Sequence, residues 1–414
     1  MPSLQSRVVS QLALRALSSV SALAFAALTA AAQTKVLSLT NTSTSNSSYV
    51  RTADAPELEP QRFTLEARIR PMGAGFGQTG TSFGATILTK PIEGTTGSFL
   101  GSWALGWEPT TSRVYAMVVN TPDSIGRFVY SNTTVPLGVE RHIAATFDGA
   151  TLALYIDGQI DAAASTSFSS VYYGNEDVLI GASNLGAGFL RRFTGEIDEV
   201  RIWDHARDER AIALLSECRL TGQESGLRLY YNFNASNALD SSGGGSNGAL
   251  VGSAVAFANE TNVLSACGSP WLTYCTAGTT TNGCLASIGA AGFASVSQNS
   301  GFVVAANGVE GQKAGLVFYG LSGASATPWL GGSSSFLCVK SPTQRSPTLA
   351  SGGVAGACNG VLALDLLAYL NSNPNSLGQP FGGGEALFLQ AWFRDPGAPS
   401  GTNLSNGLCV VLAP

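Results

Sequence analysis

The sequence predicts an all-β fold in two parts. Glycine is abundant, with 49 residues among 414, and charged residues make up only 12% of the chain, about half of the usual share. Several segments alternate between apolar and polar residues, as a strand does when one face lies on a core. Turn dipeptides such as Asp157-Gly158 follow them, which is typical of hairpins. We expect a β-sandwich over residues 34–267 and a smaller, disulfide-containing, sandwich-like domain over residues 270–414.

The N-terminal residues predict an export signal. Arg7 and Arg15 flank the start of an apolar stretch at residues 17–28, and three alanines follow at 30–32. This is the pattern of a signal peptide, and the stretch is short for a membrane span. We expect residues 1–32 to be removed and the protein to be secreted or held at the cell surface, with no transmembrane segment. A buried helix is the alternative.

Strand patterns recur along the first part. Residues 63–70, 152–156 and 227–233 each alternate between apolar and polar side chains. One short helix is predicted at residues 208–215, where acidic residues in the first turn suit the helix dipole. After residue 267 charged residues become rare while Gly and Ser become frequent, so we place the domain boundary at 267–270.

Seven cysteines follow the predicted signal. In an oxidising compartment disulfides are the expected state, and zinc is disfavoured because the chain has no CxxC pair and only two histidines. Short spacing favours Cys275–Cys284 and Cys338–Cys358, with Cys218–Cys267 closing the first domain. Other connectivities stay open, because spacing alone does not determine them. Cys409 is left over, as a free thiol or a partner for another chain.

The charge distribution excludes one class of partner. The net charge is −5 and no basic run is present. Nucleic-acid binding needs clustered Lys and Arg to displace counterions. We therefore expect no nucleic-acid partner.

Five segments together resemble a known family. They are residues 63–71, 140–149, 154–158, 193–203 and 227–233, and the strongest is FTGEIDEVRIW at 193–203. As a set they make residues 34–265 similar to laminin-G-like (LamG/pentraxin) domains of the concanavalin A-like jelly-roll class. The resemblance implies a secreted binding or adhesion protein for carbohydrate or for surface and matrix ligands, often with calcium. The usual acidic residues are missing near residues 39–50, which weakens a calcium site in that loop.

The same fold class includes glycan hydrolases, which use paired carboxylates on one strand. Their active strand reads E-x-D-x-E or E-x-D-x-x-E, and Glu196-Ile197-Asp198 begins this pattern. The third carboxylate would fall at Val200 or Arg201, and neither residue can serve. We expect no enzymatic activity. A hydrolase with another site and a purely structural surface or matrix protein are the alternatives.

Asp198 is the candidate metal ligand. Val200 and Ile202 share one face of the strand while Ile197 falls on the other, which predicts a β-bulge between them. In jelly rolls of the resembling class an Asp at this place can bind a structural calcium together with backbone carbonyls. The alternative is an Asp that accepts backbone N–H bonds at the bulge.

Histidines and aromatic residues complete the candidates. His142 lies within a predicted strand as a packing or hydrogen-bonding residue, and His205 lies in the turn before the helix, exposed or as a cap. Four aromatic residues lie in or near predicted loops and could stack on sugar rings: Trp103, Trp107, Tyr172 and Tyr173. The two tryptophans could instead belong to the core.

The second part resembles a C-terminal β domain of secreted proteins from planctomycete-type bacteria. The matching residues include 274–276, 315–320 and 394–396. The resemblance implies no activity, and Cys409 occupies a position where an acidic residue is usual.

Overall fold

The computed structural model describes residues 34–41, 48–76, 84–92, 101–122, 126–185, 189–253, 255–266, 271–329 and 334–414. The predicted signal peptide and the predicted boundary at 267–270 lie outside these residues. Among the described residues, no helix has the length and apolarity needed to cross a membrane.

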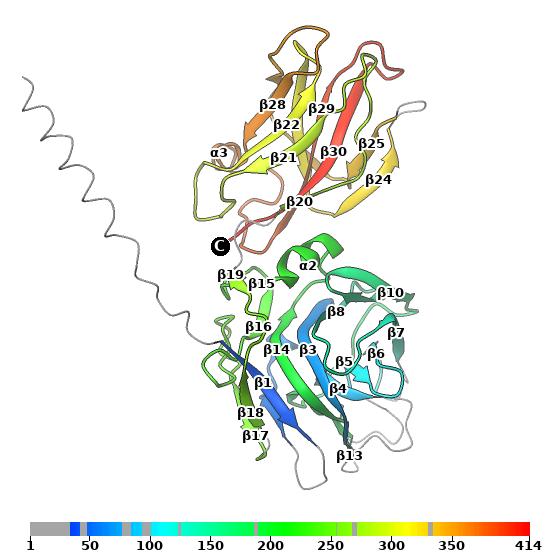
Figure 1. The fold of residues 1–414 in the computed structure, drawn as a ribbon, viewed down its shortest axis with the longest axis vertical. Helices are drawn as coiled ribbons and strands as arrows, with labels where there is room; N and C mark the ends of the chain where they lie inside the picture. The colour runs from blue at the N-terminus through cyan, green and yellow to red at the C-terminus, as the bar shows by residue number, and fades with distance from the viewer. Residues whose placement is uncertain are drawn as a thin grey trace, which may run out of the picture.

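The first domain is a sandwich of two antiparallel sheets (Figure 1). In the described part of the chain, the first sheet has the order β10(Gln159–Ser165), β9(Thr151–Ile156), β8(Arg141–Phe147), β3(Phe63–Phe76), β14(Arg192–Trp203), β1(Lys35–Thr40), β18(Val255–Asn259), with β16(Leu227–Tyr231) also on β14. The second has the order β17(Gly248–Val251), β2(Tyr49–Thr52), β11(Val178–Ile180), β4(Ala85–Lys90), β5(Trp103–Glu108), β6(Arg113–Val118), β7(Arg127–Thr134).

Alternation along the strands builds the core between these sheets. In β3, Phe63, Leu65 and Ile69 point inward and are almost fully buried, whereas Glu66 and Arg68 point to the outer face. The predicted pattern at residues 63–70 is therefore confirmed. Short elements complete the domain: η1(Pro56–Leu58), β12(Asn184–Leu185), β13(Phe189–Leu190), α2(Glu209–Ser216), β15(Cys218–Arg219) and β19(Ser265–Ala266).

Helix α2 confirms the predicted helix. The Asp208 carboxylate caps its N-terminus by accepting a hydrogen bond from the Arg210 amide at 3.0 Å. Its apolar residues Ile212 and Leu215 are buried against the first domain. The helix covers part of the outer face of the first sheet.

The second domain is also built from strands. In its described residues, one sheet has the order β20(Trp271–Tyr274), β30(Thr402–Val411), β29(Ala386–Arg394), β23(Ala314–Gly320), β26(Thr343–Arg345), with β27(Leu349–Ala350) on β23. The facing sheet is β21(Ser287–Ala291), β22(Val303–Val309), β28(Gly360–Asp365), beside α3(Leu366–Ser372) and the pair β24(Ala324–Pro328)–β25(Phe336–Val339). One apolar cluster lies between the sheets. The all-β, two-sandwich prediction is confirmed.

The predicted local disulfides are wrong. The structure pairs Cys284 with Cys358 and Cys275 with Cys338. Strands β21 and β28 both run antiparallel to β22, so the ends at which they begin, next to Cys284 and Cys358, lie together. The Tyr274 hydroxyl donates to the Cys338 carbonyl at 2.9 Å, so the end of β20 is also linked to Cys338 by a hydrogen bond.

The remaining cysteines divide into bonded and free. Cys218 is disulfide-bonded, and its predicted partner Cys267 lies outside the described residues. Cys409 is a free, buried thiol, and burial raises the pKa of that thiol. Its location in the interior disfavours a bond with another chain.

Helix α2 lies where the two domains meet (Figure 1). The Arg210 guanidinium stacks 4.4 Å from the ring centre of Tyr274. Val411 joins a buried cluster with Trp203 and Leu215, and the Ser225 amide donates to the Gly383 carbonyl. The domains therefore share apolar packing as well as backbone hydrogen bonds.

Candidate functional site

Strand β14 contains the predicted bulge. Its register against β3 shifts between Asp198 and Arg201, and Glu199 there has a φ of 49°. The bulge directs Glu199 toward Arg201 and Tyr230, to which it is hydrogen-bonded. Asp198 lines a separate small cavity.

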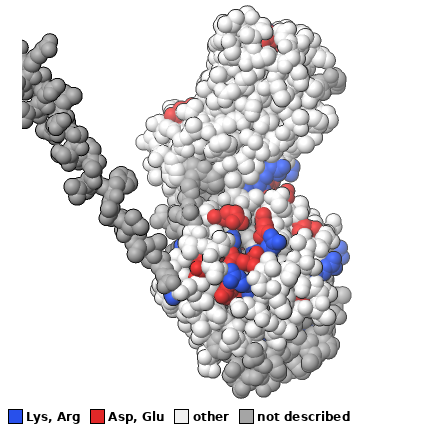
Figure 2. Space-filling view, viewed as in Figure 1, with Lys and Arg blue, Asp and Glu red and all other residues white. Residues whose placement is uncertain are grey.

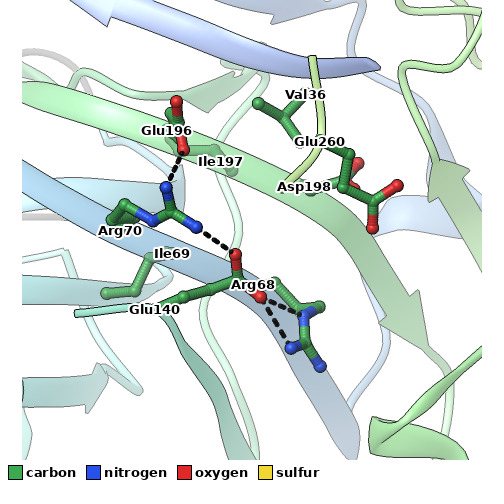
Figure 3. Close-up of a pocket in the computed structure, with 9 residues that line it drawn as sticks. All are labelled: Val36, Arg68, Ile69, Arg70, Glu140, Glu196, Ile197, Asp198 and Glu260. Carbon is green, nitrogen blue, oxygen red and sulfur yellow. Dashed lines mark hydrogen bonds and ion pairs between the residues drawn. The ribbon is translucent and has the colours of Figure 1, made fainter. Parts of the chain in front are cut away.

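Asp198 lies in that cavity without a strong partner (Figure 3). The side chain is only 4% exposed, and within the described residues no donor meets either carboxylate oxygen with hydrogen-bond geometry. Burial, followed by the charge of Glu199, raises the pKa of Asp198, and the nearby Glu199 amide only partly offsets this. Of the backbone hydrogen bonds that were the alternative role for Asp198, the described part of the chain offers only this weak contact with the Glu199 amide.

Glu260 is one of four acidic residues that line this cavity, with Asp198, Glu140 and Glu196, and Arg68 and Arg70 line it as well (Figure 3). It follows β18, and its side chain is nearly buried and ion-paired with Arg219. Its charge adds to the raised pKa of Asp198. The cavity measures about 10 Å³, close to the space that one water molecule needs. It therefore has room for an ion or a water molecule, and none for a sugar ring.

Glu196 belongs to a chain of ion pairs along the lining of the cavity (Figure 3). Its carboxylate lies 3.3 Å from Arg70, which lies 2.9 Å from Glu140, which in turn lies 2.7 Å from Arg68. The guanidinium of Arg70 thus lies between two carboxylates. Figure 2 shows a patch of mixed charge on the first domain, whereas the visible face of the second domain carries few charges.

A buried charge cluster lies under α2 on the same sheet. Glu66 accepts from Arg207 at 3.1 Å and Arg201 at 3.3 Å, and His142 Nε2 lies 3.1 Å away. Burial alone would raise the pKa of Glu66, but the hydrogen bond with His142 and the two guanidinium charges lower it well below its usual range. His142 is therefore the hydrogen-bonding core residue that the sequence predicts.

The aromatic candidates separate into core and surface residues. Trp103 and Trp107 are buried in the core, which confirms the alternative prediction that the two tryptophans belong to the core. Tyr173 packs on the core, and its hydroxyl donates to the Pro60 carbonyl at 2.6 Å. Tyr172 lies on the outer face of the second sheet.

Tyr172 forms part of an aromatic cluster. Phe128, Tyr130 and Tyr172 are partly exposed and pack against a buried cluster that includes Tyr115, whose ring centre lies 6.0 Å from that of Tyr130. Burial raises the pKa of Tyr115 to about 12. Phe128 and Tyr130 were missed in the sequence, because only the pairing of β6 with β7 brings them to this face.

Comparison with known proteins agrees with this architecture. Residues 44–213 match the laminin-G model described as the concanavalin A-like lectin/glucanases superfamily. The first domain is a concanavalin A-like jelly roll. The match confirms this part of the predicted resemblance, while the resemblance of residues 270–414 stays a prediction. None of the curated proteins compared matches the chain.

Several solved structures are similar to part of this chain at low identity. A Bacteroides ovatus protein proposed to bind carbohydrate is 19% identical, with a TM-score of 0.42, over 55% of this chain and 60% of that one. A heptameric pentraxin from Limulus polyphemus is 14% identical, with a TM-score of 0.39, over 55% and 96%. The sialidase CBM40 of Ruminococcus gnavus, bound to sialyllactose, is 14% identical, with a TM-score of 0.34, over 41% and 94%.

Proposed function

We propose that this chain is an exported protein whose concanavalin A-like domain binds carbohydrate outside the cell. The match of residues 44–213 to a lectin and glucanase superfamily supports this proposal. The observation that carries it is the aromatic cluster of Tyr115, Phe128, Tyr130 and Tyr172. Ligand sites combine aromatic surface with a few polar groups, and the partly exposed tyrosines offer both a ring face and a hydroxyl to a sugar.

Binding is favoured over hydrolysis. A retaining glycosidase needs two carboxyl groups about 5 Å apart with a sugar between them. Glu196 is paired with Arg70, and the cavity at Asp198 is far too small for a sugar. Arg201, at a position where a third carboxylate would fall, is buried against Glu66 and Glu199.

Removing the Tyr172 ring should weaken glycan binding. In Tyr172→Ala we expect the binding free energy to weaken by about 1 kcal/mol, which is roughly a fivefold rise in Kd, because an aromatic contact contributes about that much. Tyr172→Phe keeps the ring and should retain most of the affinity. The measurement is a glycan array followed by titration of the best ligand.

A matched control comes from the second domain. Trp271 is 40% exposed there, and Trp271→Ala removes a large aromatic side chain outside the cluster. It should leave glycan binding unchanged. If no glycan binds the wild type, with calcium or without it, the carbohydrate proposal fails and the structural matrix role takes its place.

We also propose Asp198 as a ligand of a structural calcium ion. An almost fully buried, ionised carboxylate without hydrogen-bond donors is costly unless it takes up a proton or a cation balances it, and the ion-sized cavity beside Asp198 has room for a cation. Asp198 and Glu260 would hold the ion. The described residues contain no cluster of three or more His, Cys, Asp or Glu, so backbone carbonyls and water would supply the other oxygens. Bound calcium would supply positive charge and link β14 to the segment after β18.

A further inference from the structure

The two domains enclose a cleft of about 480 Å³. This volume lies within the roughly 300–1,000 Å³ that is typical of small-molecule sites, which often occur between domains. The first domain contributes the turn after β14, the start of α2 and part of β16. The second contributes β29 and the loops at residues 321, 378 and 384–385. The cleft is separate from both the aromatic cluster and the cavity at Asp198.

His205 presents a hydrogen-bond acceptor to this cleft. Its side chain is 47% exposed, and its Nδ1 lies 3.0 Å from Asp204 Oδ1. Partial desolvation lowers the pKa of the imidazole. A carboxylate only accepts hydrogen bonds, so the hydrogen of the neutral ring lies on Nδ1. Nε2 is then left without a hydrogen, as an acceptor.

The positive charges at the cleft are already engaged. Arg228 Nε donates to Asp204 Oδ2 at 2.8 Å. Arg207 donates to Glu66 at 3.1 Å and to the Ala211 carbonyl at 3.0 Å. Neither guanidinium is free to neutralise a further carboxylate of the cleft.

Glu385 is the carboxylate that lacks a cationic partner. It is partly buried, which raises its pKa, and the nearby Gly382 amide and Ser225 hydroxyl partly offset that rise. No ion pair within 4 Å joins it to Lys, Arg or His of the described residues. Residues 268–414 contain only one other glutamate, Glu310, and that one is paired with Lys313 at 3.2 Å.

The cleft therefore offers an excess of acceptors and a negative charge to a ligand. We propose that it binds an amino sugar, whose ammonium group pairs with Glu385 while its hydroxyls donate to His205 Nε2 and Asp204. Leu321 and Ala386 supply an apolar wall for the C–H face of the sugar ring. The sugar class rests on the proposed carbohydrate function, but the site does not depend on the aromatic cluster.

The test is calorimetric titration of the full-length protein at pH 7 with glucosamine, N-acetylglucosamine and ethanolamine. Glucosamine should bind at least tenfold more tightly than N-acetylglucosamine, which has no ammonium group, and more tightly than ethanolamine, which has no ring. Glu385→Gln should remove the preference for glucosamine. Glu217→Gln removes an exposed carboxylate that is 64% accessible and lies outside the cleft, and it should keep that preference.

Three results would overturn this inference. They are equal affinity for glucosamine and N-acetylglucosamine, an unchanged preference in Glu385→Gln, and ethanolamine binding as tight as that of glucosamine. Tyr172→Ala separates the two proposals, because it should weaken array glycans and leave glucosamine binding intact. Glucosamine binding that requires Glu385 would stand even if the array showed no ligand for the aromatic cluster.

Discussion

Glu66→Gln is expected to lower the free energy of unfolding by about 3–5 kcal/mol, the usual cost of removing one partner from a buried ion pair. Glu66, Arg201 and Arg207 are all buried. Arg201 keeps Glu199 as a partner at 2.6 Å. Arg207 has Glu66 as its carboxylate partner, at 3.1 Å, so the variant leaves its charge in the interior. Urea unfolding followed by circular dichroism measures the loss.

The pH dependence gives this prediction a second readout. The folded state lowers the pKa of Glu66 below its ordinary value of 4.5. The group therefore contributes stability above pH 4.5, and this contribution is lost as the pH falls below that value. The wild type should lose this stability in acid, whereas the Gln variant has no such group to protonate.

An exposed ion pair supplies the control for Glu66. Asp177 pairs with Arg51, whose side chain is 60% exposed, and exposed pairs contribute about 0.2–1 kcal/mol. Asp177→Asn should therefore cost less than about 1 kcal/mol. A loss of the same small size in Glu66→Gln would show that the buried cluster does not hold α2 on the sheet.

Replacing both Cys284 and Cys358 with serine is expected to cost about 4 kcal/mol. The bond closes a loop between residues that are 74 positions apart. Closing a loop of this length lowers the entropy of the unfolded chain, which stabilises the folded state by about 4 kcal/mol. Because both thiols are removed, the replacement creates no new unpaired cysteine, and Cys409 stays the free, buried thiol that it is in the wild type. Urea unfolding of the wild type and the double variant gives the difference.

Peptide mapping without reductant checks the connectivity itself. The structure predicts cross-linked peptides that contain Cys284 with Cys358 and Cys275 with Cys338. A peptide that joins Cys275 to Cys284 would instead support the pairing expected from short spacing. Cys409→Ser is a control, because that thiol is free and its replacement should leave both cross-links in place.

Local patterns predicted the features that depend on neighbouring residues. Alternation at residues 63–70 identifies β3 because each side chain faces opposite its neighbour. The change of phase between Ile197 and Val200 revealed the bulge of β14 for the same reason. The helix after His205 was also predicted, since acidic residues mark its first turn, although the capping role of Asp208 came only from the structure.

Features that depend on contacts between distant segments could not be predicted from the sequence. Glu260 reaches the cavity at Asp198 because β18 pairs with β1 and β1 with β14. Arg201, Arg207 and His142 lie next to Glu66 because β3 lies between β8 and β14 in the sheet. The disulfide predictions were wrong for the same reason, because strand order rather than spacing in the sequence decides which cysteines lie together.

The most direct test of the site is a calcium titration followed by thermal unfolding, with the wild type and Asp198→Asn in parallel. Calcium should raise the Tm of the wild type. When the free calcium concentration is 100-fold above Kd, binding adds about 2.7 kcal/mol to the free energy of unfolding. Asp198→Asn should show no rise, because it lacks the unpaired buried carboxylate. An unchanged wild-type Tm, or an equal rise in the variant, would contradict a cation site at Asp198.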